Sequence, residues 1–225
     1  MKKLFITLLG ILLIIVVVVG GLALLRSSYS RPSVILTSSC DAPCWNGITP
    51  GQTGSWEIYE SLYEIEGISE VGSEYDRNDQ LECYTWYFDR PVEDSGGSIW
   101  FNGEQVAAVE ILTINALNLE ELFGKLGEPE SYWKEVRKGE QREYLDVFLL
   151  YPSKGYLAEV LLDTKYGSDT VQIKPGTGVF RVAYFEPEKF TELMGTKILF
   201  NAPVGADTLA LENWTGYGEI AFERE

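Results

Sequence analysis

Apolar residues are distributed very differently in the first 31 residues and in the rest of the chain. Residues 4–25 contain no charged residue and no proline. A helix of this length would reach about 33 Å, which is enough to cross a hydrocarbon core of roughly 30 Å. Because lipid leaves no other partner for the backbone amides, the β-branched run at residues 14–19 does not exclude a helix. The pattern predicts a transmembrane signal anchor over residues 1–31, followed by a tether over residues 32–45.

The charges that flank the apolar segment indicate its orientation. Lys2 and Lys3 precede it and favour a cytoplasmic N-terminus, which places the rest of the chain outside the cytoplasm. A cleaved signal peptide is an alternative, since Ser28 and Ser30 would suit a cleavage site, although the apolar region is longer than in most signal peptides. A lipoprotein is disfavoured because Cys40 lies far beyond the apolar segment. We expect a single-pass protein of the cell membrane with an extracytoplasmic domain.

Beyond the tether, short segments show the periodicity of helices. A first helix is predicted to end near Ile65, before Gly67. Its residues that recur at helical spacing are Trp56, Tyr59, Leu62 and Tyr63. Asn118 can cap a second helix over residues 119–126, and a third helix is predicted over residues 187–194.

Other segments have the composition of strands. Asn102 and Gly103 separate two runs of β-forming residues, which predicts a hairpin with a type I′ turn over residues 98–114. Further strands are predicted at residues 82–88, 131–136, 144–151, 155–162, 171–173, 179–185 and 218–222. Residues 46–225 are therefore expected to form an α+β domain of antiparallel sheets with a few short helices.

The predicted elements repeat in their order. Helix, strand, strand, turn and strand occur twice, at a spacing of about 60 residues. This order suggests two tandem helix-plus-hairpin units, over residues 46–114 and 115–163. Residues 164–225 would then form a C-terminal extension.

Charge narrows the classes of partner. Residues 1–31 carry four basic and no acidic side chains, whereas the rest of the chain carries 14 basic and 34 acidic ones. A formal charge of −16 argues against a nucleic-acid partner, because such a surface needs clustered Lys and Arg. The chain contains no His, which removes the commonest general base and metal ligand.

The motifs that could carry catalysis or bind a metal are incomplete. Ser131 and Lys134 match the S-x-x-K motif of penicillin-binding proteins, but the segment reads as a strand and the other motifs of that family are missing. Residues 76–82 suggest a calcium loop but lack the Gly that its turn requires, so a solvated acidic loop is expected there. We predict no catalytic residue, no metal site and no cofactor.

The three cysteines allow three single disulfide bonds. Paired thiols in an oxidising compartment indicate a disulfide first. Cys40 and Cys44 are close in sequence and are the favoured pair, while Cys83 lies in an aromatic strand that suits a buried thiol. A bond from Cys83 to either of the others remains an alternative, because longer loops give more stabilisation.

Tryptophans on the predicted strands offer a candidate ligand surface. Trp86, Trp100 and Trp133 could line a concave sheet face that stacks against a sugar or a peptide. The alternative is that they pack in the core or on the sheet surface, as most of the 29 aromatic residues must.

Short motifs resemble known families. The helix-opening stretch at residues 48–53 and the helix-ending stretch at residues 126–129 resemble small extracytoplasmic α+β modules: BamE (SmpA/OmlA), an outer-membrane assembly lipoprotein, and the β-lactamase inhibitor protein. Residues 43–51 and 214–218 resemble uncharacterised bacterial membrane-anchored extracytoplasmic proteins. These resemblances imply a location in the cell envelope and no particular activity.

These observations lead to one functional prediction. We expect a membrane-anchored extracytoplasmic protein-interaction module that is not an enzyme and that holds another envelope protein. The alternative is an extracytoplasmic domain that binds a glycan or a peptide. A carboxylate-based hydrolase is a third and weaker hypothesis, because no two acidic residues are marked as an acid–base pair.

Overall fold

The computed structural model describes residues 40–76, 81–88, 96–139, 142–164, 168–196, 198–199 and 210–223. The chain divides into two compact units, residues 1–32 and 33–225, and all described residues belong to the second. The predicted anchor at residues 4–25 lies outside the described residues. Among the helices of the described part, none has the length and apolar character needed to cross a membrane.

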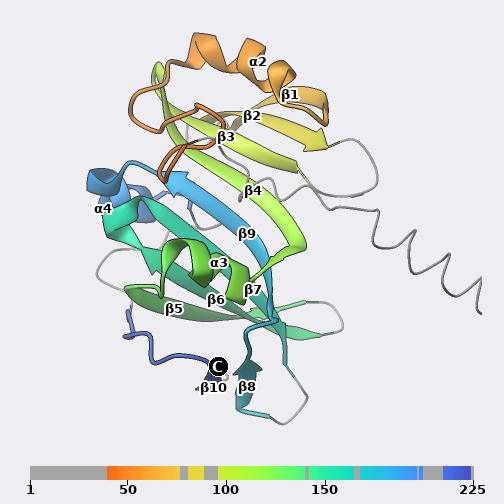
Figure 1. The fold of residues 1–225 in the computed structure, drawn as a ribbon, viewed down its shortest axis with the longest axis vertical. Helices are drawn as coiled ribbons and strands as arrows, with labels where there is room; N and C mark the ends of the chain where they lie inside the picture. The colour runs from red at the N-terminus through yellow and green to blue at the C-terminus, as the bar shows by residue number, and fades with distance from the viewer. Residues whose placement is uncertain are drawn as a thin grey trace, which may run out of the picture. The chain divides into compact units, whose positions relative to one another are not determined.

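The described residues form one antiparallel sheet of eight strands, in the order β1-β2-β3-β4-β9-β7-β6-β5 (Figure 1). Its strands in chain order are β1 (Ile68–Asp76), β2 (Leu81–Phe88), β3 (Gly96–Asn102), β4 (Gln105–Asn118), β5 (Ser131–Lys138), β6 (Glu143–Tyr151), β7 (Tyr156–Asp163) and β9 (Gly178–Phe185). A separate two-stranded sheet pairs β8 (Thr170–Ile173) with β10 (Gly218–Ala221).

The helices in the described part of the chain are short and few. They are α2 (Ser55–Glu64), α3 (Leu119–Leu126), α4 (Phe190–Met194) and the 3₁₀ turns η1 (Pro152–Lys154) and η2 (Pro187–Lys189). Their positions agree with the three predicted helices. The Asn118 side chain caps α3 as predicted, because it accepts a hydrogen bond from the amide of Glu121 at 2.9 Å.

The prediction of an α+β fold with separate tandem units was wrong. The α-helices of the described part have 10, 8 and 5 residues, whereas β4 alone has 14. Strands from both predicted units join one sheet, because β9 from the predicted C-terminal extension lies between β4 and β7. The fold is therefore a mainly antiparallel β structure. Pairing between β4 and β9 is long-range, and a local pattern carries no information about it.

The β3–β4 hairpin was predicted correctly except for its turn. Asn102 pairs with Gln105, so the turn is centred on Gly103 and Glu104 rather than on Asn102 and Gly103. Only Gly103 of this turn has a positive φ, +64°. The turn is therefore displaced by one residue from the predicted type I′ geometry.

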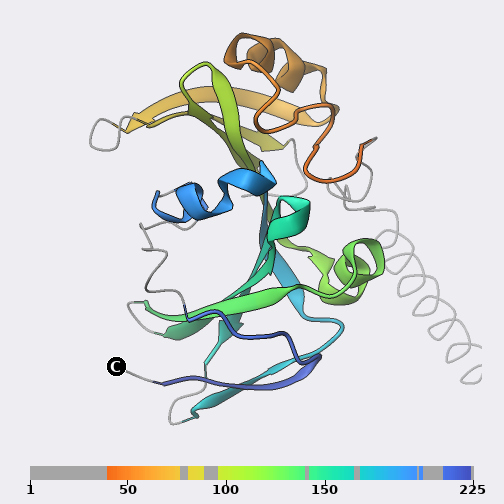
Figure 2. The same ribbon diagram turned by 90° about the vertical axis from the view of Figure 1, so that its left-hand side faces the viewer.

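Apolar side chains cover both faces of the central strands. On the first face, Ile58 and Leu62 of α2 and Leu119 and Leu122 of α3 belong to the larger core. On the second face, residues of α4 and the following segment cover a smaller core. Figure 2 shows α4 on the opposite side of the sheet from α3. Burial on both faces explains why β6 reads as a nearly continuous apolar run.

Candidate functional site

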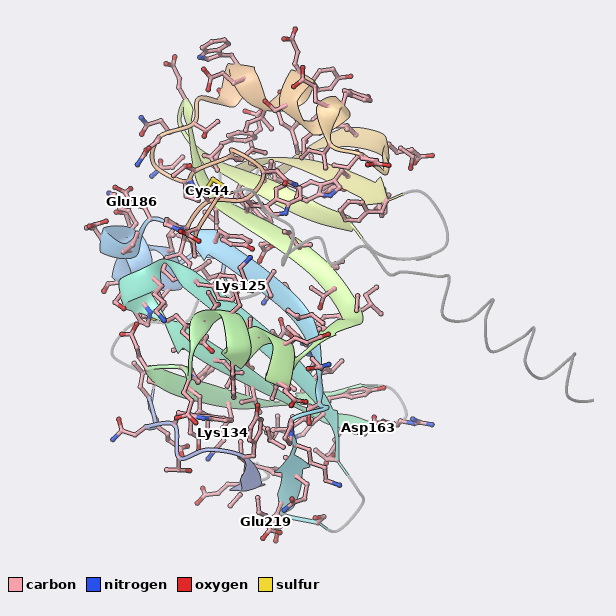
Figure 3. All side chains as sticks on the ribbon, in the orientation of Figure 1. Cys44, Lys125, Lys134, Asp163, Glu186 and Glu219 are labelled. Carbon is pink, nitrogen blue, oxygen red and sulfur yellow. A yellow bond between two sulfur atoms is a disulfide. The ribbon has the colours of Figure 1, made fainter. Side chains whose placement is uncertain are left out.

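The described part of the chain opens with a loop that a disulfide closes. Cys40 and Cys44 are bonded, with their Cα atoms 5.6 Å apart, so the favoured pairing is confirmed. Figure 3 shows Cys44 on the α2 side of the sheet. Cys83 is a buried free thiol. Burial, with Glu74 and Glu110 nearby, raises its pKa to about 11, so the thiol stays protonated at neutral pH.

A tight turn follows the disulfide and fixes the loop to the core. Trp45 and Ile48 exchange backbone hydrogen bonds of 2.9 and 2.8 Å across Asn46 and Gly47. Both turn residues have positive φ, as an Asn-Gly pair permits. The Trp45 ring stacks on Trp86 with ring centroids 5.1 Å apart. The loop is therefore a fixed part of the domain.

The start of α2 is tied to the β3–β4 hairpin. Gly51 donates to the carbonyl of Val106 at 2.8 Å, and Val106 donates to Thr53 at 3.0 Å. Ser55 donates to the carbonyl of Glu104 at 2.8 Å. These backbone bonds hold the N-terminus of α2 in place, so the helix presents its side chains from a rigid base.

Helix α2 separates its apolar side chains into two stripes. Ile58 and Leu62, spaced four residues apart, are fully buried against the sheet. Trp56, Tyr59 and Tyr63 are 80%, 49% and 52% exposed. We call these three residues the α2 aromatic face. Figure 3 shows side chains of α2 that project away from the sheet.

Aromatic contacts connect the α2 aromatic face to the core beneath it. The Tyr59 and Tyr63 rings meet edge to face with centroids 5.2 Å apart. Tyr59 also meets Tyr84 of β2 at 6.0 Å, and Tyr84 meets the buried Phe101 at 5.2 Å. The hydrogen bond with the Tyr59 hydroxyl raises the pKa of Tyr63, so the Tyr63 hydroxyl stays protonated at neutral pH. These edge-to-face contacts link the exposed rings to the buried Phe101.

Acidic side chains frame the α2 aromatic face. Glu57, Glu60 and Glu64 are exposed on the same helix, and the helix carries no basic residue. An exposed aromatic surface with carboxylates around it can pack on apolar groups and attract Lys or Arg side chains. The sequence predicted this helix but not its exposed face. The signal was available: Ile58 and Leu62 form one stripe, and the three aromatic residues form another.

The predicted ligand face does not assemble. Trp86 is 1% exposed and packs in the first core. Trp100 packs against the second core, on the other face, and its indole Nε1 donates to Glu110 at 2.9 Å. Trp133, on the far edge strand β5, stacks on Phe148 at 5.0 Å. The three tryptophans therefore do not share a surface.

A row of charged residues crosses the second face of the sheet, which the sequence did not predict. Arg181 donates to Glu110 at 2.6 Å and to Glu159 at 2.7 Å. Arg137 donates to Glu159 at 3.0 Å and to Asp146 at 2.6 Å. The row thus joins β4, β9, β7, β6 and β5. Its three carboxylates and two guanidinium groups leave one negative charge in excess.

The acidic residues of this row are unsuited to hydrolysis. Glu110, Asp146 and Glu159 are 8%, 3% and 0% exposed, so a substrate has no access to them. Burial and the neighbouring Glu159 raise the pKa of Asp146 to about 6, and one of its oxygens has no hydrogen-bond partner. Burial also raises the pKa of Glu110. Within the described ranges, no group of acidic or Cys side chains could hold a metal ion.

Comparison with known proteins adds little. No protein-family model matches the chain, and no curated protein matches it. A cysteine-rich secretory protein from Staphylococcus aureus subsp. aureus Mu50, known from its crystal structure, is 12% identical, with a TM-score of 0.29. The match covers 67% of this chain and 51% of that chain, so it spans about half the length of that protein. A TM-score this low carries no argument about fold or function.

Proposed function

We propose that this protein is a membrane-anchored extracytoplasmic interaction module whose α2 aromatic face binds another envelope protein. One observation carries the proposal. Trp56, Tyr59 and Tyr63 lie on one side of a helix whose other side is fully buried, and each is about half or more exposed. Trp and Tyr are enriched among the residues that contribute most to protein–protein binding. Adjacent exposed aromatic residues on a rigid helix mark an interaction surface.

The charges around the face favour a particular kind of partner. Glu57, Glu60 and Glu64 would repel anionic lipid headgroups, so a membrane surface is disfavoured. The same carboxylates would attract Lys and Arg side chains at the rim of a protein interface. We therefore infer a partner surface with an apolar centre and a basic rim.

The proposed location rests on other parts of the chain. The apolar segment at residues 4–25, preceded by Lys2 and Lys3, supports an anchor with the acidic domain outside the cytoplasm. The disulfide between Cys40 and Cys44 is consistent with an oxidising compartment. External protease should therefore digest the domain on spheroplasts, and full protection would contradict this orientation.

A pull-down with matched variants tests the proposed function. We would compare the wild type, the double variant Trp56→Ala/Tyr63→Ala and the control Tyr87→Ala in detergent-solubilised membranes. Tyr87 is a suitable control because its exposed fraction, 54%, is similar to that of Tyr63, but it lies on β2 and not on α2. The wild type and the control should recover the same protein, and the double variant should lose it. Equal recovery by all three, or no recovered protein, would contradict the proposal.

Tryptophan fluorescence distinguishes a protein partner from the alternative, a glycan or peptide ligand. The chain has six tryptophans, and only Trp56 among them is largely exposed. A soluble quencher should therefore act mainly on Trp56, and the variant Trp56→Phe should remove most of the quenching. Protection of Trp56 by the recovered protein would support the proposal. Protection by simple sugars or short peptides instead would support the alternative.

A further inference from the structure

Helix α2 carries two rows of exposed side chains that run side by side. The α2 aromatic face forms the first row, with residues at positions i, i+3 and i+7. Glu57, Glu60 and Glu64 repeat this spacing one residue later, and we call them the carboxylate row. Consecutive residues of a helix are separated by about 100° around its axis, so the carboxylate row follows the aromatic row over two turns.

The carboxylate row is not neutralised by its surroundings. Over residues 40–76, 81–88 and 96–106, the structure describes ten acidic residues and no Lys or Arg. Glu60 and Glu64 form no ion pair and no side-chain hydrogen bond within the described part of the chain. The Glu57 carboxylate accepts one long hydrogen bond, of 3.4 Å, from the amide of Gly54. The row therefore presents negative charge that a partner can neutralise.

The area of the aromatic rings shows that both rows belong to one contact. A buried Trp or Tyr covers about 150–250 Å², so the exposed parts of the α2 aromatic face offer roughly 300–450 Å². A stable protein interface buries about 800 Å² on each partner. The aromatic row alone is too small for such an interface, so a stable complex has to include the neighbouring carboxylate row.

Two adjacent rows select the kind of element that can pair with α2. One face of a strand presents a single row, because its successive side chains point to opposite faces. A helix presents neighbouring rows about 100° apart, with the same spacing of three and four residues along its axis. Of the two, the helix can place apolar side chains on the α2 aromatic face and basic side chains on the carboxylate row at once.

We propose that the partner presents an amphipathic α-helix, packed lengthwise on α2, with an apolar row and an adjacent row of Lys or Arg. Its apolar row packs on the α2 aromatic face, with the two helix axes about 8–10 Å apart. Its basic row pairs with Glu60 and Glu64, which raises the association rate and makes binding sensitive to salt. This inference rests on the proposed function and names the element through which the partner binds.

Designed peptides test the proposal on the purified full-length protein in a non-ionic detergent. The first peptide has about 20 residues, enough to form a helix, with a row of Leu and an adjacent row of Lys. A second peptide carries Glu in place of Lys, and a third has the composition of the first with its Lys residues moved opposite the Leu row. Fluorescence anisotropy should show that the first peptide binds at least about tenfold more tightly than the others, and that high salt weakens its binding.

Charge reversal identifies the row that selects the peptide. Glu60→Lys/Glu64→Lys should weaken binding of the Lys peptide by about tenfold and should bind the Glu peptide in its place. The matched control, Glu70→Lys/Glu74→Lys, reverses two exposed carboxylates with the same spacing on β1 and should bind like the wild type. Thermal unfolding of every variant shows whether it folds.

The aromatic row is tested by its own variant. Trp56→Ala/Tyr63→Ala keeps every charge and should lose the Lys peptide, which excludes binding through charge or detergent alone. Equal binding of the three peptides, no binding of the Lys peptide, or no effect of the α2 charge reversal would overturn the inference.

The pull-down described above tests the proposed function separately. If it recovers a protein that depends on Trp56 and Tyr63 while the three peptides are not distinguished, the partner binds through a different element and this inference alone fails. Equal recovery by all variants in the pull-down would contradict the proposed function itself, whichever peptide binds.

Discussion

Helices α2 and α3 are alike in length and position but differ in what covers them. In both, the N-cap amide donates to the Glu at the third helical position, Glu57 in α2 and Glu121 in α3, and both bury two aliphatic residues in the first core. The outward aromatic residue of α3, Phe123, stacks on Tyr217 at 5.4 Å and meets Trp214 edge to face at 5.5 Å. Within the described residues, no comparable segment covers Trp56 of α2, which is 80% exposed. Among the described residues, the C-terminal segment thus covers α3, whereas the outer side of α2 stays exposed.

The C-terminal cover of α3 is fixed by few contacts. Trp214 meets both Phe123 and Tyr132. Glu212 accepts a hydrogen bond from the Tyr132 hydroxyl at 2.6 Å and forms an ion pair with Lys134. Burial, together with the hydrogen bond to Glu212, raises the pKa of Tyr132 to about 12, so this hydroxyl remains a donor at neutral pH. These contacts can be removed singly, which allows the comparison between the helices to be tested.

The largest expected effect follows from Trp214→Ala. This variant removes the half-buried Trp214 ring, which contacts Phe123 and Tyr132. Part of the α3 surface is then left uncovered. We expect a loss of about 2–3 kcal/mol in the free energy of unfolding, somewhat less than for a fully buried Trp. Urea denaturation measures it. A loss below about 0.5 kcal/mol, the range of ordinary surface substitutions, would show that the cover adds nothing to α3.

A second prediction concerns how the free energy of unfolding of the domain depends on pH in mild acid. Burial raises the pKa of Asp146 to about 6, above the value of about 3.9 expected in the unfolded chain. The folded state then binds a proton more tightly, so the free energy of unfolding should fall as the pH rises from about 4 to about 7. The change is about 2–3 kcal/mol at most. Asp146→Asn should flatten this slope in urea titrations at several pH values, and an unchanged slope would rule out Asp146 as its source.

Stronger acid should loosen the cover of α3 and not change α2. Glu212 forms an ion pair with Lys134 and accepts hydrogen bonds from Lys134 and Tyr132, and these contacts lower its pKa. Its stabilising effect is therefore complete above the unfolded pKa of about 4.3 and is lost as the pH falls through the lower folded value. Glu212→Gln should cost about 1 kcal/mol at neutral pH. Hydrogen exchange of α3 amides should rise in the variant, and equal increases in α2 would contradict the difference between the helices.

The smallest effect on stability is expected at the α2 aromatic face. Trp56 and Tyr63 are largely exposed, so Trp56→Ala/Tyr63→Ala should change the free energy of unfolding by less than about 0.5 kcal/mol per residue. A residue that contributes to binding and not to folding should show this combination of near-normal stability and lost partner. A loss above about 2 kcal/mol in thermal or urea unfolding would place the face in the fold rather than in an interface.

Local features of this fold could be predicted from the sequence. Asn118 caps α3, Gly103 turns the β3–β4 hairpin, and Cys40 bonds to Cys44. Each depends on residues within a few positions of one another, where residue type restricts the backbone. Strand β1 was not predicted, because its mostly polar residues resemble a loop when they are considered alone.

Long-range features could not be predicted from one sequence. Glu110 and Arg181 are 71 positions apart and meet because β4 pairs with β9. Trp86 and Trp100 are candidates for one ligand face in the sequence, but their neighbouring strands place the two rings on opposite faces of the sheet. The exposure of Trp56 depends on what the rest of the chain leaves uncovered. Such facts belong to packing, and the periodicity of a single segment does not contain them.

Site-specific photocrosslinking tests the central claim most directly. A photoreactive phenylalanine analogue would replace Trp56 in one full-length variant and Tyr87 in another, expressed in cells that make the protein naturally. The two positions are both exposed but lie on different elements. Irradiation should give one discrete protein adduct from position 56 and none from position 87. No adduct from position 56, or the same adducts from both positions, would contradict the assignment of α2 as the binding face.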